Sequence, residues 1–484
     1  MRVSFVIAVL VAFFVVFSCC ALMLCMGAGV VISAMPGLQE VLNEWTPQAT
    51  PVPIIVRTLP SAEERSTEDL LAQTKVPERD LVDIVMRLKK PAQPIPRIVR
   101  DTPLDYQIGD QEVFWISDQS INLNFTAEAT LRYATPHLYM WVENGYDVNE
   151  DDLKRSADRF ENHIYPTNHS YFDSEWSPGI DGDVRLHIFN GHVPGVGGYF
   201  SSSDEYPKAV NPYSNEREMF YINLDGLRPG NEYYDSILAH EFQHMIHWNI
   251  DKNEDTWVNE GLSELASRLN GYDPGGTEWP FQSRPDTQLT AWADDPDSAA
   301  SNYGSSYLFM VYFLQRFGED TLRRMVASQA NGADGFNQAL TEGGWRLTFK
   351  DVFADWLIAN YLDDTDPGGE GRYSYKDMEV QVALDHSHSG YPDSRTTTVH
   401  QYAADYIELT NIPDDLTIEF SGSTIVRLAD TTPHSGRYMW WSNRGDESNM
   451  TMTRAFDLTG LERATLQVWL WYDIEKDWDY AYIE

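Results

Sequence analysis

The stretch "LAHEFQHMIHWNIDKNEDTWVNEGLSELA", residues 238–266, decides the fold because it predicts two consecutive helices built to one plan. His240 and His244 lie four residues apart, about 40° on a helical wheel, so both imidazoles can reach one cation. The apolar side chains of the same helix fall on the opposite side, and they are Leu238, Phe242, Met245 and Ile246. We therefore predict a helix that packs its apolar face on the core and turns its histidines into a cleft.

The next helix, expected over 256–269, repeats this plan with acidic residues. Its leucines follow helical spacing, whereas Glu260 and Glu264 fall on the face opposite to them. Two glutamates on one face, directly after an HExxH helix, favour a metal site over an ordinary solvent-exposed helix without a binding role. The predicted zinc ligands are His240, His244 and Glu260. Glu264, one turn further on, is predicted to accept a hydrogen bond from the other nitrogen of a ligand histidine.

Glu241 lies beside the two histidines in the sequence and can meet a water molecule held by the metal. Zinc lowers the pKa of such a water toward neutrality, and a nearby carboxylate can then take its proton. The pattern therefore predicts metal-assisted hydrolysis with Glu241 as the general base.

His247 competes with Glu260 for the third ligand position. It lies seven residues after His240, which is about 10.5 Å along a helix axis. One zinc ion with ligand bonds near 2 Å cannot easily bind both on a straight helix. The metzincin pattern would also need glycine at 247 and histidine at 250, where this chain has His247 and Ile250. We predict Glu260 as the ligand and His247 as a neighbour that shapes the pocket.

Length and composition limit the class of protein. A chain of 484 residues has room for two or three domains. With 35 lysines and arginines against 74 acidic residues, its formal charge of −39 repels phosphate, so we expect no nucleic-acid partner. A hydrophobic content of 42% excludes a disordered chain. The acidic excess suits a soluble extracellular protein and leaves room for Ca²⁺.

Residues 1–35 predict the cellular location of the protein. Only Arg2 is charged in this segment, which is long enough to span a bilayer and is followed by the acidic Glu40 and Glu44. We expect an uncleaved signal-anchor, or alternatively a signal peptide cleaved after a small residue such as Gly29. All three cysteines lie here, so the exported part has neither a thiolate ligand nor a disulfide.

The rest of the chain is expected to fall into three parts. Residues 36–110 are rich in proline and predict a stalk or a pro-segment. Residues 111–395 predict an α+β domain, with strands in 128–143, 183–191 and 218–225 and helices at 149–165, 232–249, 256–269, 303–328 and 349–362. Residues 396–484 alternate short apolar runs with turns, which predicts an all-β sandwich. Since the chain stops at "DYAYIE" within a strand pattern, we expect this sandwich to be truncated.

These motifs resemble those of the gluzincin metallopeptidases, the thermolysin-like group whose third zinc ligand is a glutamate on a following helix. "HEFQH" and "NEGLSE" carry the resemblance, which implies Asn259 and Glu264 as supporting residues beside the ligands. A nearer resemblance is to the bacterial immune inhibitor A family of secreted metallopeptidases. "AHEFQHMIHW", "WVNEGLSELA" and the C-terminal "LWYDIEKDWDYAYIE" are similar to that family over about 200–484.

Two further features are expected to serve catalysis. Gluzincins often carry a tyrosine that steadies the oxyanion, and the helix beginning "SNYGSSYLF" offers Tyr303 first and Tyr307 second, with core packing as the alternative for both. "GVGGYFSSSDEYP", residues 195–207, is expected to supply an edge strand to which a peptide substrate adds, or else a simple hairpin.

Two acidic runs are candidates for calcium, although acidic loops are more often simply solvated. The candidate ligands are Asp363, Asp364, Asp366 and Glu370 in one loop and Asp473, Glu475, Asp477 and Asp479 in the C-terminal run.

The sequence as a whole predicts an extracellular zinc endopeptidase, either membrane-anchored through residues 1–35 or secreted after cleavage, that acts on protein or peptide substrates. The alternative is a cell-surface adhesion or binding protein that uses an inactive protease scaffold. The intact set of His240, Glu241, His244 and Glu260 favours the enzyme, since a degenerate scaffold would be expected to have lost one of them.

Overall fold

The computed structural model describes residues 66–293, 295–364, 369, 371–412, 415–475 and 479–483. The chain separates into two units, 1–74 and 75–484. In the described part of the first unit, helix α3 (Thr67–Gln73) begins with a capping box formed by Ser66 and Asp69. The predicted membrane segment 1–35 lies outside the described residues, and no helix within them is long and apolar enough to cross a bilayer.

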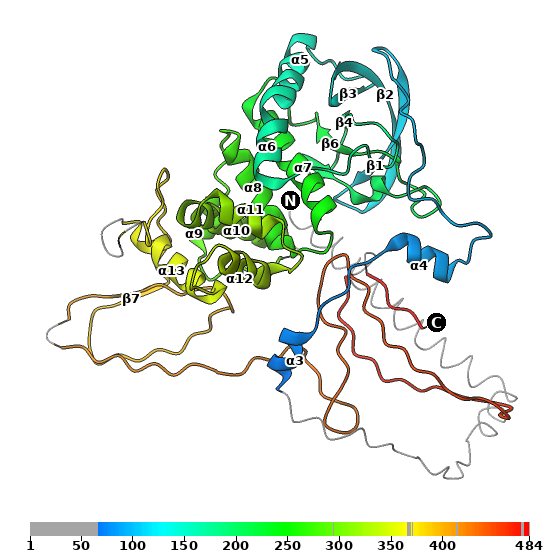
Figure 1. Ribbon diagram of the computed structural model, residues 1–484. Helices are drawn as coiled ribbons and strands as arrows, with labels where there is room; N and C mark the ends of the chain where they lie inside the picture. The colour runs from blue at the N-terminus through cyan, green and yellow to red at the C-terminus, as the bar shows by residue number, and fades with distance from the viewer. Residues whose placement is uncertain are drawn as a thin grey trace, which may run out of the picture. The chain divides into compact units, whose positions relative to one another are not determined.

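The second unit contains a six-stranded mixed sheet with the strand order β1-β2-β3-β4-β6-β5 (Figure 1). The strands β1, β2 and β3 are antiparallel, β3, β4 and β6 are parallel, and β5 pairs antiparallel with β6 at the edge. Their bounds are β1 Gln111–Asp118, β2 Leu123–Thr135, β3 Leu138–Glu143, β4 Leu186–Gly191, β5 Gly198–Phe200 and β6 Met219–Asn223. The edge position predicted for 195–207 is therefore occupied by β5.

Side-chain alternation along β3 connects the sheet to two separate apolar layers. Leu138, Met140 and Val142 point into the main core, whereas Tyr139 and Trp141 point into a second core on the other face. Successive side chains of a strand point to opposite faces, so a central strand covered on both sides must be apolar throughout. The sheet is thus a buried platform, and its main-core face carries the helix with the HExxH motif.

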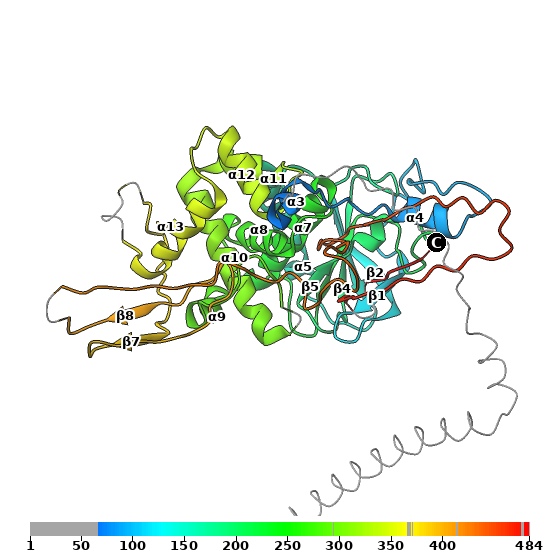
Figure 2. The same cartoon turned by 90° about the horizontal axis from the view of Figure 1, so that it is seen from below.

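Helices make up most of the remaining regular secondary structure of the second unit, as Figures 1 and 2 show. Their bounds are α4 Leu81–Leu88, α5 Glu150–Arg159, α6 Tyr165–Phe172, α7 Glu232–Ile250, α8 Thr256–Leu269, α9 Glu278–Ser283, α10 Pro296–Phe317, α11 Glu319–Val326, α12 Gly332–Glu342 and α13 Phe349–Leu362. The sheet and these helices confirm the α+β class. Packing of α8 against both α7 and α10 continues the main core away from the sheet.

Two predicted helices differ from those observed. The helix expected over 149–165 continues to Phe172, because a π-helical turn at Phe160–Ile164 joins α5 to α6. The helix expected over 303–328 begins earlier, at Pro296, where the Asp295 side chain accepts a hydrogen bond from the Ser298 amide. It is also divided in two, because Gly318 has a φ of +80° and ends α10 before α11 begins.

Residues 75–110 pack against the sheet and its flanking loops. Val82 and Val85 of α4 are buried with Tyr206 and Trp248, and the Val99 amide donates to the Ile180 carbonyl. The aromatic ring of Tyr106 meets Trp141 edge-on, at 5.0 Å between centroids. This segment therefore covers part of the second core.

The predicted β-sandwich over 396–484 is not confirmed by the structure. In the described part of that range the only strand of three residues or more is β8 (Ile407–Leu409), which pairs in parallel with β7 (His386–His388). Strand-like alternation stabilises a sheet only when each strand has a partner and its apolar face is covered. In this region Phe420 and Trp440 are instead 91% and 86% exposed.

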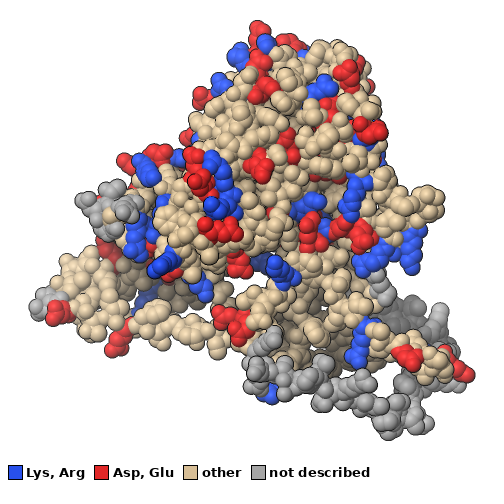
Figure 3. All heavy atoms as spheres, viewed as in Figure 1, with Lys and Arg blue, Asp and Glu red and all other residues tan. Residues whose placement is uncertain are grey.

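The surface of the described residues mixes charges of both signs. On the face drawn in Figure 3, acidic side chains lie among lysines and arginines. Many of them pair locally, as in Lys154–Asp158 at 2.8 Å along α5. Such exposed pairs contribute little each, but they reduce repulsion within a strongly acidic chain.

Gly261 decides how closely α8 approaches α10. A Cβ atom at this position would lie 2.9 Å from Met310 Cγ and 3.0 Å from the Ser306 carbonyl oxygen. Because one of these neighbours is backbone, a side chain would force the two helices apart. Glu260 is the adjacent residue, so the same contact determines where its carboxylate stands.

We expect Gly261→Ala to lower the free energy of unfolding by about 1–3 kcal/mol through overpacking, despite the better helix propensity of alanine. Urea unfolding followed by circular dichroism measures the change. Gly226→Ala is the matched control, because a Cβ atom there meets nothing within 4 Å. Equal stability of the two variants would contradict the proposed close approach.

Candidate metal centre

Helix α7 is buried on almost every side and carries the HExxH motif through the middle of the unit. Asn231 caps its start by accepting a hydrogen bond from the Tyr233 amide, and Asp251 follows its end. Leu238, Phe242 and Ile246 pack in the main core, as the helical wheel predicts. The opposite face is covered by α8, so the two histidines stand between the helices instead of at an open surface.

Three side chains from α7 and α8 converge on one point. His244 Nε2 lies 3.1 Å from His240 Nε2, and Glu260 Oε2 lies 3.4 Å and 3.5 Å from those two nitrogens. Their ligand atoms all lie within 4.8 Å of one another, and no other group of three histidines or acids in the described residues meets this condition. The structure thus brings together the residues that the sequence predicted as ligands.

The chemistry of these three groups fits a divalent metal. Glu260 Oε2 is buried and has no hydrogen-bond partner, although buried carboxylate oxygens are normally bonded. Two imidazole nitrogens with one carboxylate oxygen are a donor set of the kind that zinc accepts, with positions left for water or substrate. The side chains remain 11–18% exposed, so a ligand can enter.

The charges of the site stabilise one another. Burial opposes the protonated form of His240, but Glu260, Glu241 and Glu264 outweigh it and raise its pKa to about 9. Burial also opposes ionisation of Glu260, but the two histidines lower its pKa well below the usual value. A low-dielectric pocket with several carboxylates around two imidazoles therefore favours positive charge at its centre.

Glu264 and Asn259 were both expected to support the ligands. Glu264 Oε1 lies 3.7 Å from His240 Nδ1, the ring nitrogen that faces away from the convergence point. Asn259 differs, because its amide donates to the Glu254 carbonyl at 3.3 Å and its other contact is with His247. Ser263 instead lies 3.1 Å from His244 Nδ1. A helical serine gives no metal-site signal in a sequence, which is why Ser263 was missed.

Glu241 and Tyr303 lie beside the same three residues. Burial raises the pKa of the Glu241 carboxyl group, which also accepts a hydrogen bond from the Phe200 amide of β5. The charge of Glu260, followed by burial, holds the pKa of Tyr303 well above 10. Tyr307, the second candidate, is 2% exposed and accepts a hydrogen bond from Arg268. Tyr303 is therefore the tyrosine nearer to the carboxylates of the site.

His247 lies outside the converging group. Its ring is 1% exposed, and its Nδ1 atom has no hydrogen-bond partner. Burial lowers its pKa to about 4, and the charge of His244 acts in the same direction. The ring is accordingly neutral at physiological pH and fills the pocket wall.

The calcium candidates do not form a cluster in the described residues. Both oxygens of Asp363 already accept backbone hydrogen bonds, from the Tyr375 and Val380 amides, so this residue closes the loop after α13. The Glu475 amide donates a hydrogen bond to the Asp479 carboxylate at 3.4 Å. Asp364 and Asp473 also lie within the described residues. The other candidates, Asp366, Glu370 and Asp477, lie outside the described residues.

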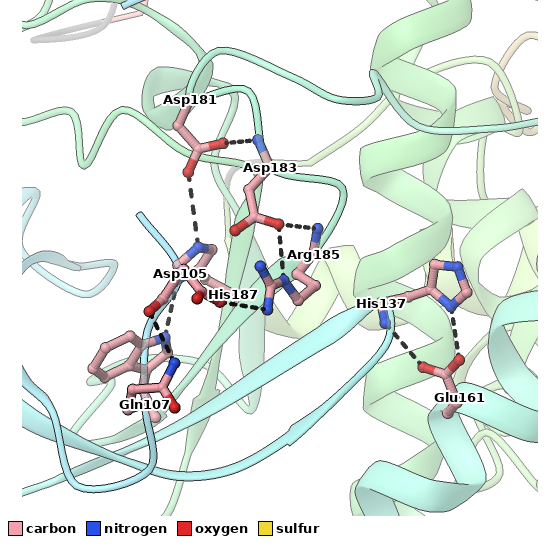
Figure 4. A network of polar contacts seen from close by, with 9 residues as sticks. Asp105, Gln107, His137, Glu161, Asp181, Asp183, Arg185 and His187 are labelled. Carbon is pink, nitrogen blue, oxygen red and sulfur yellow. Dashed lines mark hydrogen bonds and ion pairs between the residues drawn. The ribbon is translucent and has the colours of Figure 1, made fainter. Parts of the chain in front are cut away.

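Two histidines outside this group have structural partners, as Figure 4 shows for the buried His187 and the partly exposed His137. The Trp141 indole donates to His187 Nδ1 at 2.9 Å, and Asp181 lies 3.8 Å from Nε2. His137 contacts Glu161 at 2.7 Å. Complete burial lowers the pKa of His187 well below 6.5, so that ring is a neutral core residue.

An HExxH helix followed by a helix that brings a glutamate to the two histidines is the arrangement that the predicted resemblance to metallopeptidases implies. Comparisons with known proteins agree. A family model described as "Immune inhibitor A-like, MAM domain" matches residues 417–484. Neutral metalloprotease ShpI of Staphylococcus hyicus is 24% identical over 262 residues, which cover 48% of this chain and 58% of ShpI. These matches confirm the predicted resemblance to immune inhibitor A-like metallopeptidases.

Two further matches are shorter or more distant. Pre-pro-metalloprotease PrtV of Vibrio cholerae serotype O1 (strain M66-2) is 38% identical over 55 residues, which cover 11% of this chain and 6% of PrtV. A solved structure of a functionally unknown conserved protein mutant from Bacillus anthracis str. Ames overlaps 52% of this chain and 66% of its own, with 9% identity and a TM-score of 0.26. A TM-score this low does not define a shared fold. The matched region spans little more than half of ShpI and far less of PrtV.

The buried neutral His247 predicts a pH-dependent stability. Its pKa is about 4 in the folded protein and near 6.5 when unfolded. Between these values only the unfolded state takes up a proton, so stability present above pH 6.5 is lost as the pH falls toward 4, by up to about 3 kcal/mol. We expect His247→Gln to lack this component, which urea unfolding at pH 7, 6 and 5 measures. A free-energy difference between wild type and variant that stays constant with pH would contradict the assignment.

Proposed function

We propose that this chain is a zinc-dependent endopeptidase that acts on protein or peptide substrates outside the cell. The observation that carries the proposal is the convergence of His240, His244 and Glu260 within 4.8 Å, with the buried Glu241 beside them. The similarity to proteins named as metalloproteases supports it. Cysteines confined to residues 1–35 support an exported domain that does not depend on a redox state.

In this proposal His240, His244 and Glu260 hold the metal. Zinc bound there supplies a Lewis acid that polarises the scissile carbonyl and makes the attacking water more acidic. Glu241 takes a proton from that water at its carboxylate as the new C–O bond forms. It then gives the proton to the amide nitrogen as the C–N bond breaks. Burial raises the pKa of Glu241, which suits a group that must both accept and donate a proton.

Two neighbours complete the proposed reaction. Tyr303 keeps its phenolic proton, because nearby carboxylates and burial hold its pKa well above 10, so it can donate to the developing oxyanion. The strand β5 is at the edge of the sheet, and its Phe200 amide contacts Glu241. A peptide that adds to this edge would therefore bring its backbone beside the general base.

Glu241→Gln is expected to lower casein hydrolysis by the full chain by about 100- to 10,000-fold, because the amide cannot take the proton. Zinc content measured on the same preparations should remain equal to that of wild type, since Glu241 is not a proposed ligand. If wild type contains no zinc, or if the variant hydrolyses casein at the wild-type rate, the proposed mechanism is wrong.

Glu260→Ala and His247→Ala together test the choice of third ligand. Loss of a supporting residue costs about 10- to 100-fold in metal affinity, so loss of a ligand should cost at least about 100-fold. We therefore expect Glu260→Ala to weaken zinc binding at least that much and His247→Ala by less than about 10-fold. Competition with a chromophoric chelator measures both dissociation constants. The reverse order would make His247 the ligand.

A further inference from the structure

A hydrogen-bonded chain of three residues runs from α7 to α8 behind the candidate metal centre. Ser263 Oγ of α8 donates to Gln243 Oε1 of α7 at 2.5 Å and lies 3.1 Å from His244 Nδ1. Both Ser263 and Gln243 are completely buried. Water therefore does not compete for these contacts, and each partner depends on the other two.

The direction of this chain determines which nitrogen of His244 carries a proton. A serine hydroxyl has one hydrogen, and here it is used on Gln243 Oε1. Toward His244, Ser263 can then only accept, so the imidazole proton must be on Nδ1. In a neutral imidazole the lone pair is then on Nε2, which is the atom that faces His240 and Glu260.

The reverse direction would oppose metal binding. If the Gln243 amide were turned over, its NH₂ group would donate to Ser263, and the serine hydrogen would point at His244 Nδ1. The imidazole proton would then be on Nε2, at the convergence point. A cation bound at His244 Nε2 therefore favours the orientation in which Gln243 Oε1 faces Ser263. That orientation in turn favours cation binding at Nε2.

We propose that Ser263, oriented by Gln243, is the positioning residue for His244. Glu264 lies 3.7 Å from His240 Nδ1, and in this proposal it would position that histidine in the same way. Glu260, Ser263 and Glu264 follow i, i+3, i+4 spacing, so one face of α8 supplies a ligand and a support for each histidine. The inference rests on the proposed function, because it assumes that His244 Nε2 binds the metal.

Zinc affinity of the full chain, measured by chelator competition, tests the proposal through a double-mutant cycle. We expect Ser263→Ala and Gln243→Met each to weaken zinc binding by about 10- to 100-fold. The double variant should be no weaker than Ser263→Ala alone, because Gln243 acts only through the serine. Independent effects that multiply in the double variant would overturn the chain of contacts.

Ser267→Ala is the matched control. Ser267 is also buried on α8 and also bonds to α7, with its hydroxyl donating to the Ser236 carbonyl at 3.0 Å, but it does not contact the site. We expect it to leave zinc affinity unchanged while lowering metal-free stability in urea about as much as Ser263→Ala does. Should Ser263→Ala fail to fold, Gln243→Met against Ser267→Ala gives the same comparison.

The outcomes separate this inference from the proposed function. If wild type binds no zinc, both are wrong. If wild type binds zinc and Ser263→Ala binds it as tightly as Ser267→Ala, only the positioning role is wrong. Loss of affinity in Ser263→Ala and Gln243→Met, with wild-type affinity in Ser267→Ala and no further loss in the double variant, supports the role.

Discussion

The structure depends on the contact between the Glu260 carboxylate and the two imidazoles of α7. It places a buried negative group against two bases, 3.4 and 3.5 Å away, and joins two helices at their polar faces. Buried charges are tolerated only when they are paired or coordinate a metal. The elements around this contact can therefore be understood as its supports: the sheet holds α7, and α10 holds α8 through the close approach at Gly261.

The same low-dielectric surroundings explain why several titratable groups of the site have shifted pKa values. Burial raises the pKa of Glu241 and of Glu264, and the two histidines oppose this rise, whereas for Tyr303 the charge of Glu260 comes first and burial adds to it. Separation of pKa values among close groups is how one pocket can supply both an acid and a base. His247 lies at the edge of this pocket and is neutral, because burial and the charge of His244 both lower its pKa.

Local patterns predicted the parts of the fold that depend on periodicity. The predicted ranges 349–362 and 256–269 match α13 and α8, and the predicted range 232–249 ends one residue before α7 does. Predictions were less accurate where one residue's backbone decides, as at Gly318, and the β-sandwich predicted over 396–484 is not confirmed. Strand alternation gives the faces of a strand but does not supply its neighbours. Residues 1–35 and several calcium candidates remain predictions for a different reason, because they lie outside the described residues.

The sequence by itself determined which residues could form the centre, because helical spacing alone places His240, His244, Glu260 and Glu264 on facing stripes and puts His247 out of reach. Only the tertiary structure decided how those residues are supported. It directed Asn259 toward Glu254 and His247, and it brought Ser263 to His244 Nδ1. The physical reason is that periodicity describes one helix, whereas a hydrogen bond between helices depends on their separation and rotation, which the packing of α8 against both α7 and α10 sets.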